Sequence, residues 1–239
     1  MVRQARNWGL WVALSLIGIW AMSTGILFSL DLARLPSWFK FVSFAWQMFL
    51  YVGLFVTAHD GMHVSIAPSN PKLNDAIGRF VLCAYAMFPF AKMRQMHDLH
   101  HDIPARPGDP DFHNGKRNNF FAWYFNFMQN YWSWLRLVLL ISTFHVVHQV
   151  FGVSESNLSW FWVFPSVMSS FQLFLFGTFL PHREPINGYV NDCHATSTPF
   201  SEFWSLISCY HFGYHEEHHD LPHLGWWQLP QARKLRELN

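Results

Sequence analysis

The chain has 239 residues, of which 51% are hydrophobic and 19% aromatic, whereas only 13% are charged. A soluble globular domain carries about 25% charged residues, so this composition argues against an ordinary soluble protein. The net charge is +1 and no run of basic residues stands out, which argues against binding to nucleic acid.

Long apolar stretches predict four membrane-spanning helices, because a helix needs about 20 apolar residues to cross a bilayer. These stretches cover residues 8–30, 38–57, 131–151 and 160–180. The first is too long for a signal peptide and lacks a small-residue cleavage site. We therefore expect an all-α, multi-pass integral membrane protein that lies in the lipid bilayer.

Two shorter helices are expected between the second and third spans. Residues 76–90 are apolar but too few for an easy crossing, and Pro89 interrupts them, so we expect a helix that dips into the membrane or is buried. Residues 120–128 are rich in aromatic side chains and predict a helix at the membrane interface. Because no repeat or linker divides the sequence, residues 1–239 are expected to form a single domain.

Four spans bring both ends of the chain to one side of the membrane. The same topology brings nearly all lysine and arginine residues to that side and leaves Arg34 and Lys40 opposite. By the positive-inside rule, the side with the two termini is predicted to be cytoplasmic.

Three five-residue windows, 59–63, 97–101 and 215–219, contain eight of the 15 histidines. Their spacing of i, i+4 or i, i+3, i+4 turns the imidazoles onto one face of a helix, where they can share a metal. The predicted topology brings all three windows to the cytoplasmic side. Eight imidazoles exceed the ligands of one metal ion, so the sequence predicts a two-metal site. The eight residues are His59, His63, His97, His100, His101, His215, His218 and His219.

Imidazole binds iron, copper, nickel and zinc, so the ligands alone do not select the metal. The surrounding sequence is apolar and aromatic, and it lacks a nucleophile motif such as Gly-x-Ser-x-Gly. This setting suits oxidation of an unactivated C–H bond by a metal that reacts with oxygen better than it suits hydrolysis. Iron is therefore the expected metal.

The three windows resemble, in order and topology, the three histidine boxes of the membrane-bound fatty acid desaturase and hydroxylase superfamily. Shorter segments resemble the bacterial and cyanobacterial β-carotene ketolases. They are residues 59–63, 108–113, 176–183 and 210–219.

This resemblance implies a non-haem di-iron oxygenase with two iron ions that acts on β-carotene and related carotenoids. It would use O2 as co-substrate and an external electron donor such as ferredoxin. The implied reaction places two hydroxyl groups on C4 of a β-ionone ring and then loses water to leave a ketone. β-Carotene would become echinenone and then canthaxanthin, as part of carotenoid biosynthesis.

Members of the superfamily use a further histidine between the fourth span and the last box. His194 is the closest match to that position, so it is predicted to be the ninth metal ligand. His211 is the rival, because it lies four residues before His215 and would share its helical face.

Four other residues are candidates for catalytic roles. His182 follows the fourth span at the depth of the boxes and could orient a ligand or the substrate ring. Asp109, Asp111 and His113 lie in a proline-rich loop that could cap the ring, although a solvated turn is the plainer interpretation. His145 and His148 should be structural, because they lie roughly 20 Å or more along the third span from its cytoplasmic end.

Two kinds of alternative function are consistent with parts of this pattern. A carotenoid ring hydroxylase or a fatty acyl desaturase could use the same scaffold. A membrane haem electron carrier or a metal transporter would need single histidines on facing spans or polar residues at the bilayer midplane. The sequence has neither feature.

Overall fold

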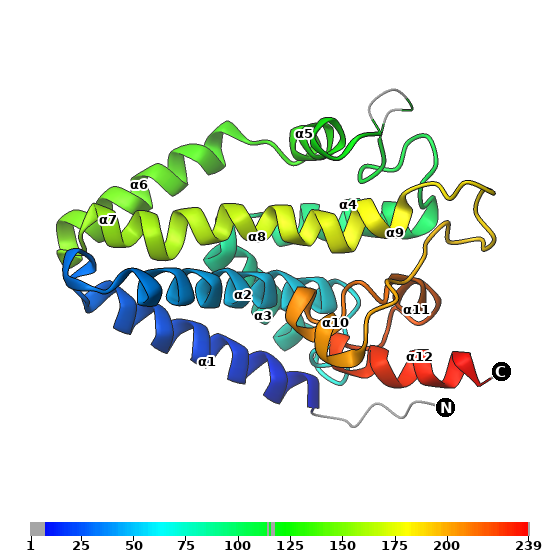
Figure 1. The fold of residues 1–239 in the computed structure, drawn as a ribbon, viewed down its shortest axis with the longest axis horizontal. Helices are drawn as coiled ribbons and strands as arrows, with labels where there is room; N and C mark the ends of the chain where they lie inside the picture. Colours follow the sequence, from blue (N-terminus) through cyan, green and yellow to red (C-terminus); the bar gives the residue numbers. More distant parts are fainter. Residues whose placement is uncertain (1–7, 114, 116–117, 239) are drawn as a thin grey trace.

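The computed structural model describes residues 8–113, 115 and 118–238, and every regular element among them is a helix (Figure 1). Four helices in this part of the chain are long and apolar enough to cross a membrane, which confirms the predicted number of spans. They are α1 (Trp8–Ser29), α2 (Ser37–Met62), α6 (Trp134–Phe151) and the continuous helix Glu155–His182.

The fourth span consists of five consecutive segments without a break in the chain direction. They are α7 (Glu155–Leu158), the π-helical η2 (Ser159–Val163), α8 (Phe164–Phe174), the π-helical η3 (Leu175–Phe179) and α9 (Leu180–His182). A π-helical turn adds a residue to the helix and so rotates the side chains that follow it. The segment η3 therefore sets the direction in which α9 presents its side chains.

The short apolar segment before the second histidine window forms a bent pair of helices. The helices α3 (Pro71–Ala86) and α4 (Phe90–Asp102) meet at an angle of 99°. The Asn70 side chain accepts a hydrogen bond from the Leu73 amide at the start of α3, and Met87 ends that helix in the left-handed conformation. Pro89 then precedes α4. The bend turns the histidines of α4 towards the end of α2.

Helix α2 is the centre of the bundle and packs against α1, α3 and α8. Its residues Val52, Leu54 and Val56 have no exposed surface. By contrast, α6 buries none of its residues, and it diverges from α8 as it leaves α5 (Phe120–Asn130) (Figure 1). One side of the bundle is therefore tightly packed and the other is open.

The C-terminal helices gather at the end of the bundle where α1 begins (Figure 1). They are α10 (Glu202–Cys209), α11 (His215–Asp220), the short η4 (Trp226–Gln228) and α12 (Leu229–Glu237). We call this the histidine end, because α11 carries the third histidine window. Residues 1–7 and 239 lie outside the described part of the chain.

The opposite end of the bundle, which we call the far end, contains η1 (Leu32–Arg34) and α7 (Figure 1). The buried Asn157 side-chain amide donates hydrogen bonds to the carbonyl oxygens of Leu27 and Leu30, at 3.1 Å and 2.6 Å. These bonds satisfy carbonyl groups at the C-terminus of α1 that have no partner within the helix. They also fix the position of α7 at the far end.

Candidate metal centre

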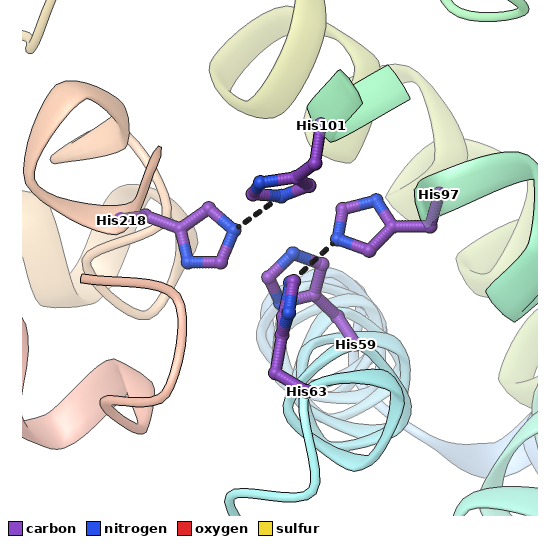
Figure 2. A group of neighbouring side chains, drawn as sticks. All are labelled: His59, His63, His97, His101 and His218. Carbon is purple, nitrogen blue, oxygen red and sulfur yellow. Dashed lines mark hydrogen bonds between the residues drawn. The ribbon is translucent and has the colours of Figure 1, made fainter. Parts of the chain in front are cut away.

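Five histidines from three helical regions converge in a first group at the histidine end (Figure 2). One nitrogen from each ring lies within 4.8 Å of the others. The Nε2 atoms of His63 and His97 are 2.8 Å apart, and those of His101 and His218 are 3.1 Å apart. The group consists of His59, His63, His97, His101 and His218.

A second group of four histidines lies beside the first. Its members are His100, His182, His215 and His219, and their facing nitrogens also lie within 4.8 Å of one another. The Nε2 atom of His215 is 3.0 Å from that of His182 and 3.2 Å from that of His219. The two groups together contain all eight histidines of the three windows and one more.

The helical spacing divides each of two windows between the groups. On α4, His97 and His101 are four residues apart and face the first group, whereas His100 faces the second. On α11 the arrangement is reversed: His215 and His219 face the second group and His218 the first. Both helices therefore contribute to both groups, which keeps two bound metals next to each other.

The distances and the unpaired nitrogens fit a bound cation in each group. Two imidazole nitrogens that bind one metal at about 2.1 Å lie about 3–4 Å apart, as these nitrogens do. Both ring nitrogens of His59 are buried without a hydrogen-bond partner. Burying an unpaired polar atom costs free energy, and coordination to a metal would remove that cost for one of the two nitrogens.

The electrostatics keep most of these imidazoles in the neutral form that binds metals, whereas at His100 the Asp109 and Asp111 carboxylates outweigh the effect of burial and raise the pKa. Burial, and then the nearby histidines, hold the pKa values of His215 and His218 well below the usual range. Burial and the neighbouring Arg94 guanidinium lower the pKa of His63 to about 4. At neutral pH these rings are therefore neutral, with a proton on only one of the two nitrogens.

Hydrogen bonds from the outer nitrogens orient two of the rings. The Nδ1 atom of His100 lies 3.0 Å from both carboxylate oxygens of Asp109, and Nδ1 of His182 donates to the carbonyl oxygen of His194 at 2.9 Å. When Nδ1 carries the proton, Nε2 is free to bind a metal. Asp109 itself accepts hydrogen bonds from the amides of Ala105 and Asp111, which hold its carboxylate in place.

The structure groups His182, and not His194, with the histidines of the three windows. His182, which was expected to orient a ligand or the ring, stands in the second group, and His194 stands outside both groups. The His194 ring stacks on Tyr189 at 4.4 Å, and only its backbone carbonyl reaches His182. The ring of the rival His211 stacks on Tyr214, also outside both groups. From the sequence, His182 could be placed near the metal site only because it directly follows the fourth span, at the depth of the three histidine windows.

The proline-rich loop contributes two carboxylates but not the expected imidazole. Asp109 contacts His100. Asp111 accepts a hydrogen bond from the Tyr131 hydroxyl and lines a cavity that begins at the histidine groups. Burial raises the pKa of Asp111 to about 6. His113 packs against Phe112 and Trp123 and does not line the cavity, so it does not form the predicted cap over a ring.

A cavity of about 640 Å³ leads from the histidine groups into the bundle. His59 and His97 from the first group and His100 and His215 from the second form its inner end. Most of its wall is apolar, and α6 and the fourth span supply the largest part of it. These wall residues could not be identified from the sequence, because periodicity alone does not distinguish cavity-facing from lipid-facing positions in an apolar helix. Examples are Phe55, Phe144, Trp162, Leu173 and Phe212.

Comparison with known proteins agrees with this geometry. The sequence model of the family described as fatty acid desaturase matches residues 36–147 and 115–238. The chain is 37% identical over 224 residues to a beta-carotene ketolase of a Paracoccus species, and the alignment covers 93% of this chain and 87% of that protein. It is 40% identical over 189 residues to the beta-carotene ketolase of another Paracoccus strain, covering 77% of this chain and 75% of the relative.

A further relative is described as acting on a carotenoid with hydroxylated rings. The chain is 33% identical over 242 residues to the zeaxanthin 4-ketolase of Chlamydomonas reinhardtii. The alignment covers 95% of this chain but only 53% of that protein, so the chain spans about half the length of this relative.

Proposed function

The chain belongs to the fatty acid desaturase family, and on this basis we propose that it is a membrane-bound di-iron β-carotene 4-ketolase. It converts C4 of a β-ionone ring to a ketone, so that β-carotene yields echinenone and then canthaxanthin. The proposal is supported most directly by one observation: histidines of both groups line the same end of a long, mostly apolar cavity.

Nine histidines would hold the two iron ions. His59, His63, His97, His101 and His218 surround one position, and His100, His182, His215 and His219 surround the other. When bound, the iron pair supplies the O2-dependent oxidation of a C–H bond, which amino-acid side chains cannot perform. The electrons come from an external donor, for which we propose ferredoxin.

The protein positions the substrate and excludes water. The apolar wall accepts a rigid polyene along the cavity, which directs one ring towards the histidines. The Phe212 ring lies 4.7 Å from that of His59, and both rings line the inner end of the cavity. Its bulk keeps water from the reacting carbon, which protects the oxidation from side reactions.

Two polar groups of the cavity wall lie near the histidine end. The Tyr131 hydroxyl donates to the Asp111 carboxylate, and both residues line the cavity together with His97 and His100. We propose that this pair contacts the ring being oxidised. It offers a hydrogen-bond acceptor for a hydroxyl group on that ring, which suits hydroxylated carotenoids as further substrates.

The orientation in the membrane is also part of the proposal. Arg34 and Lys40 lie in η1 and in the first turns of α2, at the far end, whereas basic residues such as Lys92, Arg94 and Arg106 lie at the histidine end. By the positive-inside rule, the histidine end faces the cytoplasm. A soluble electron donor would then reach the metal pair from that side.

Expression in cells that make β-carotene tests this function. We expect the mono-ketone and the diketone with the wild-type chain and neither ketone with His218→Ala, as measured by chromatography of the extracted carotenoids. Hydroxylated rings without ketone would instead identify a ring hydroxylase. Unchanged carotenoids with new double bonds in the acyl lipids would identify a desaturase, and a haem absorption band would refute the di-iron centre.

A further inference from the structure

The main cavity does not end near the histidines but continues to the far end of the bundle. Its wall includes Gly177 and Thr178 close to the histidine groups, and Ser159 and Glu155 at the opposite end of the same helix. The helix between Ser159 and Gly177 is about 25 Å long, at roughly 1.5 Å per residue. A long, rigid molecule with one ring at the histidines therefore has its other ring near Ser159.

The middle of the cavity offers a polyene almost only apolar surface. Phe55, Leu140, Phe144 and Leu173 line it, and the rings of Phe144 and Trp162 stack with their centroids 6.3 Å apart. No charged side chain of the described wall lies between Arg136 on α6 and Glu155 on α7. The hydroxyls of Tyr85, Ser166 and Ser170 also line the cavity, but each donates to a backbone carbonyl group of the fourth span. This part of the wall therefore recognises mainly length and shape.

The far end of the cavity is different because three polar side chains line it. They are His145 on α6, Glu155 on α7 and Ser159 on η2. Together they offer hydrogen-bond donors and acceptors at the end of an otherwise apolar cavity. We call these three residues the far-end subsite.

Neighbouring contacts hold the far-end subsite in place. The Nδ1 atom of His148 donates to the Val153 carbonyl oxygen at 2.8 Å, and its Nε2 atom lies 3.8 Å from the Glu155 carboxylate. The buried Asn157, two residues after Glu155, binds the C-terminus of α1. Glu155 and Ser159 thus belong to a fixed part of the fold, which makes them suited to specific recognition.

We propose that the far-end subsite binds the ring that is not being oxidised and favours a ring that already carries oxygen. This inference rests on the proposed ketolase function. A hydrocarbon ring forms no hydrogen bond with these three side chains, whereas a keto oxygen accepts from His145 or Ser159, and a hydroxyl group also donates to the exposed Glu155 carboxylate. The preferred substrates are carotenoids with oxygen at one end, including the enzyme's own mono-ketone product.

This preference has a consequence for the course of the reaction. After the first ring is oxidised, the molecule must leave and bind again in the opposite direction. The new ketone then occupies the far-end subsite while the untouched ring lies at the histidines. The subsite therefore promotes the second oxidation and favours the diketone over the mono-ketone.

The test compares two substrates with the purified, iron-loaded protein in lipid nanodiscs, supplied with O2 and with reduced ferredoxin as the electron donor. The measured quantity is the ratio of kcat/KM for the mono-ketone to kcat/KM for β-carotene. We expect His145→Leu to lower this ratio about tenfold, and Ser159→Ala to lower it in the same direction. Val146→Leu is the matched control, because Val146 is the next residue on α6 and does not line the cavity, so the ratio should not change.

The outcomes separate this inference from the proposed function. A ratio that stays within twofold of wild type, or rises, in both subsite variants overturns the far-end subsite while the ketolase function stands. Failure of the wild-type protein to form ketone from either substrate refutes the function itself. If His145→Leu does not accumulate in the membrane, Ser159→Ala decides the question by the same ratio.

Discussion

The Asp109 carboxylate and the His100 imidazole form a buried pair, with both carboxylate oxygens 3.0 Å from Nδ1. Their side chains are only 1% and 3% exposed, so water cannot replace either partner. The pair connects the proline-rich loop to the second histidine group, and it presents Nε2 of His100 to the metal position.

Asp109→Asn should weaken metal binding without removing a ligand. An amide is a poorer acceptor than a carboxylate, and loss of such a partner typically lowers metal affinity or activity about 10–100-fold. Iron content and ketone yield should both fall. The matched control is Asp98→Asn, which changes an exposed carboxylate on the same helix as His100 and should keep both near wild type. Normal iron content in Asp109→Asn would show that the pair does not orient the ligand.

His182→Ala and His194→Asn should have unequal effects. His182 faces the second group, so its loss should reduce bound iron from two ions per chain towards one and abolish ketone formation. His194 has a positive φ of 45°, which asparagine tolerates, and the carbonyl oxygen that binds His182 belongs to the backbone. His194→Asn should therefore retain most iron and activity in elemental analysis and product assays. The reverse result would restore His194 as the ninth ligand.

Gly177→Ala should disturb the inner end of the cavity. A Cβ atom at this position would lie 2.1 Å from the Phe212 ring, which packs against His59. The ring must move, and we expect a cost of about 1–3 kcal/mol in stability together with a marked loss of ketone. Gly18→Ala is the control, because nothing lies within 4 Å of its Cβ position. A second change, Phe212→Leu, should recover part of the stability if the clash is the cause.

Removal of the metal should separate stability from catalysis. A ligand that binds only the folded state raises Tm, so a chelator should lower Tm and abolish ketone formation. Adding Fe(II) should restore both properties. Zn(II), which also binds imidazole but has no redox chemistry, should restore Tm alone. An unchanged Tm after complete removal of metal would contradict a centre that connects α2, α4 and α11.

Local sequence patterns were sufficient to predict the four spans and most of the histidines that come together. Apolar length predicts a membrane helix because lipid cannot satisfy backbone polar groups, so helix α1 could be predicted from residues 8–30. The spacing within α4 and α11 indicates which imidazoles share a helical face. Pro89 likewise indicated the break before α4, although its angle of 99° depends on packing against α2.

Which of His182 and His194 faces the second histidine group is decided by the tertiary structure. Both follow the fourth span, and both are histidines at a depth where a ligand was expected. The π-helical segment η3 rotates α9 so that His182 faces His215, with their Nε2 atoms 3.0 Å apart. His194 lies in a turn that directs its ring towards Tyr189. The apolar pattern of the fourth span does not indicate this difference.

The sequence by itself determined an all-helical protein with four apolar spans and three metal-binding windows, because these features depend on composition and on spacing within one helix. Only the tertiary structure decided how the nine histidines divide into two groups and which residues line the cavity. Those features depend on contacts between helices far apart in the chain, such as His59 on α2 and His218 on α11. The same packing brings His145 and Glu155 to the far end of the cavity whose inner end His215 lines.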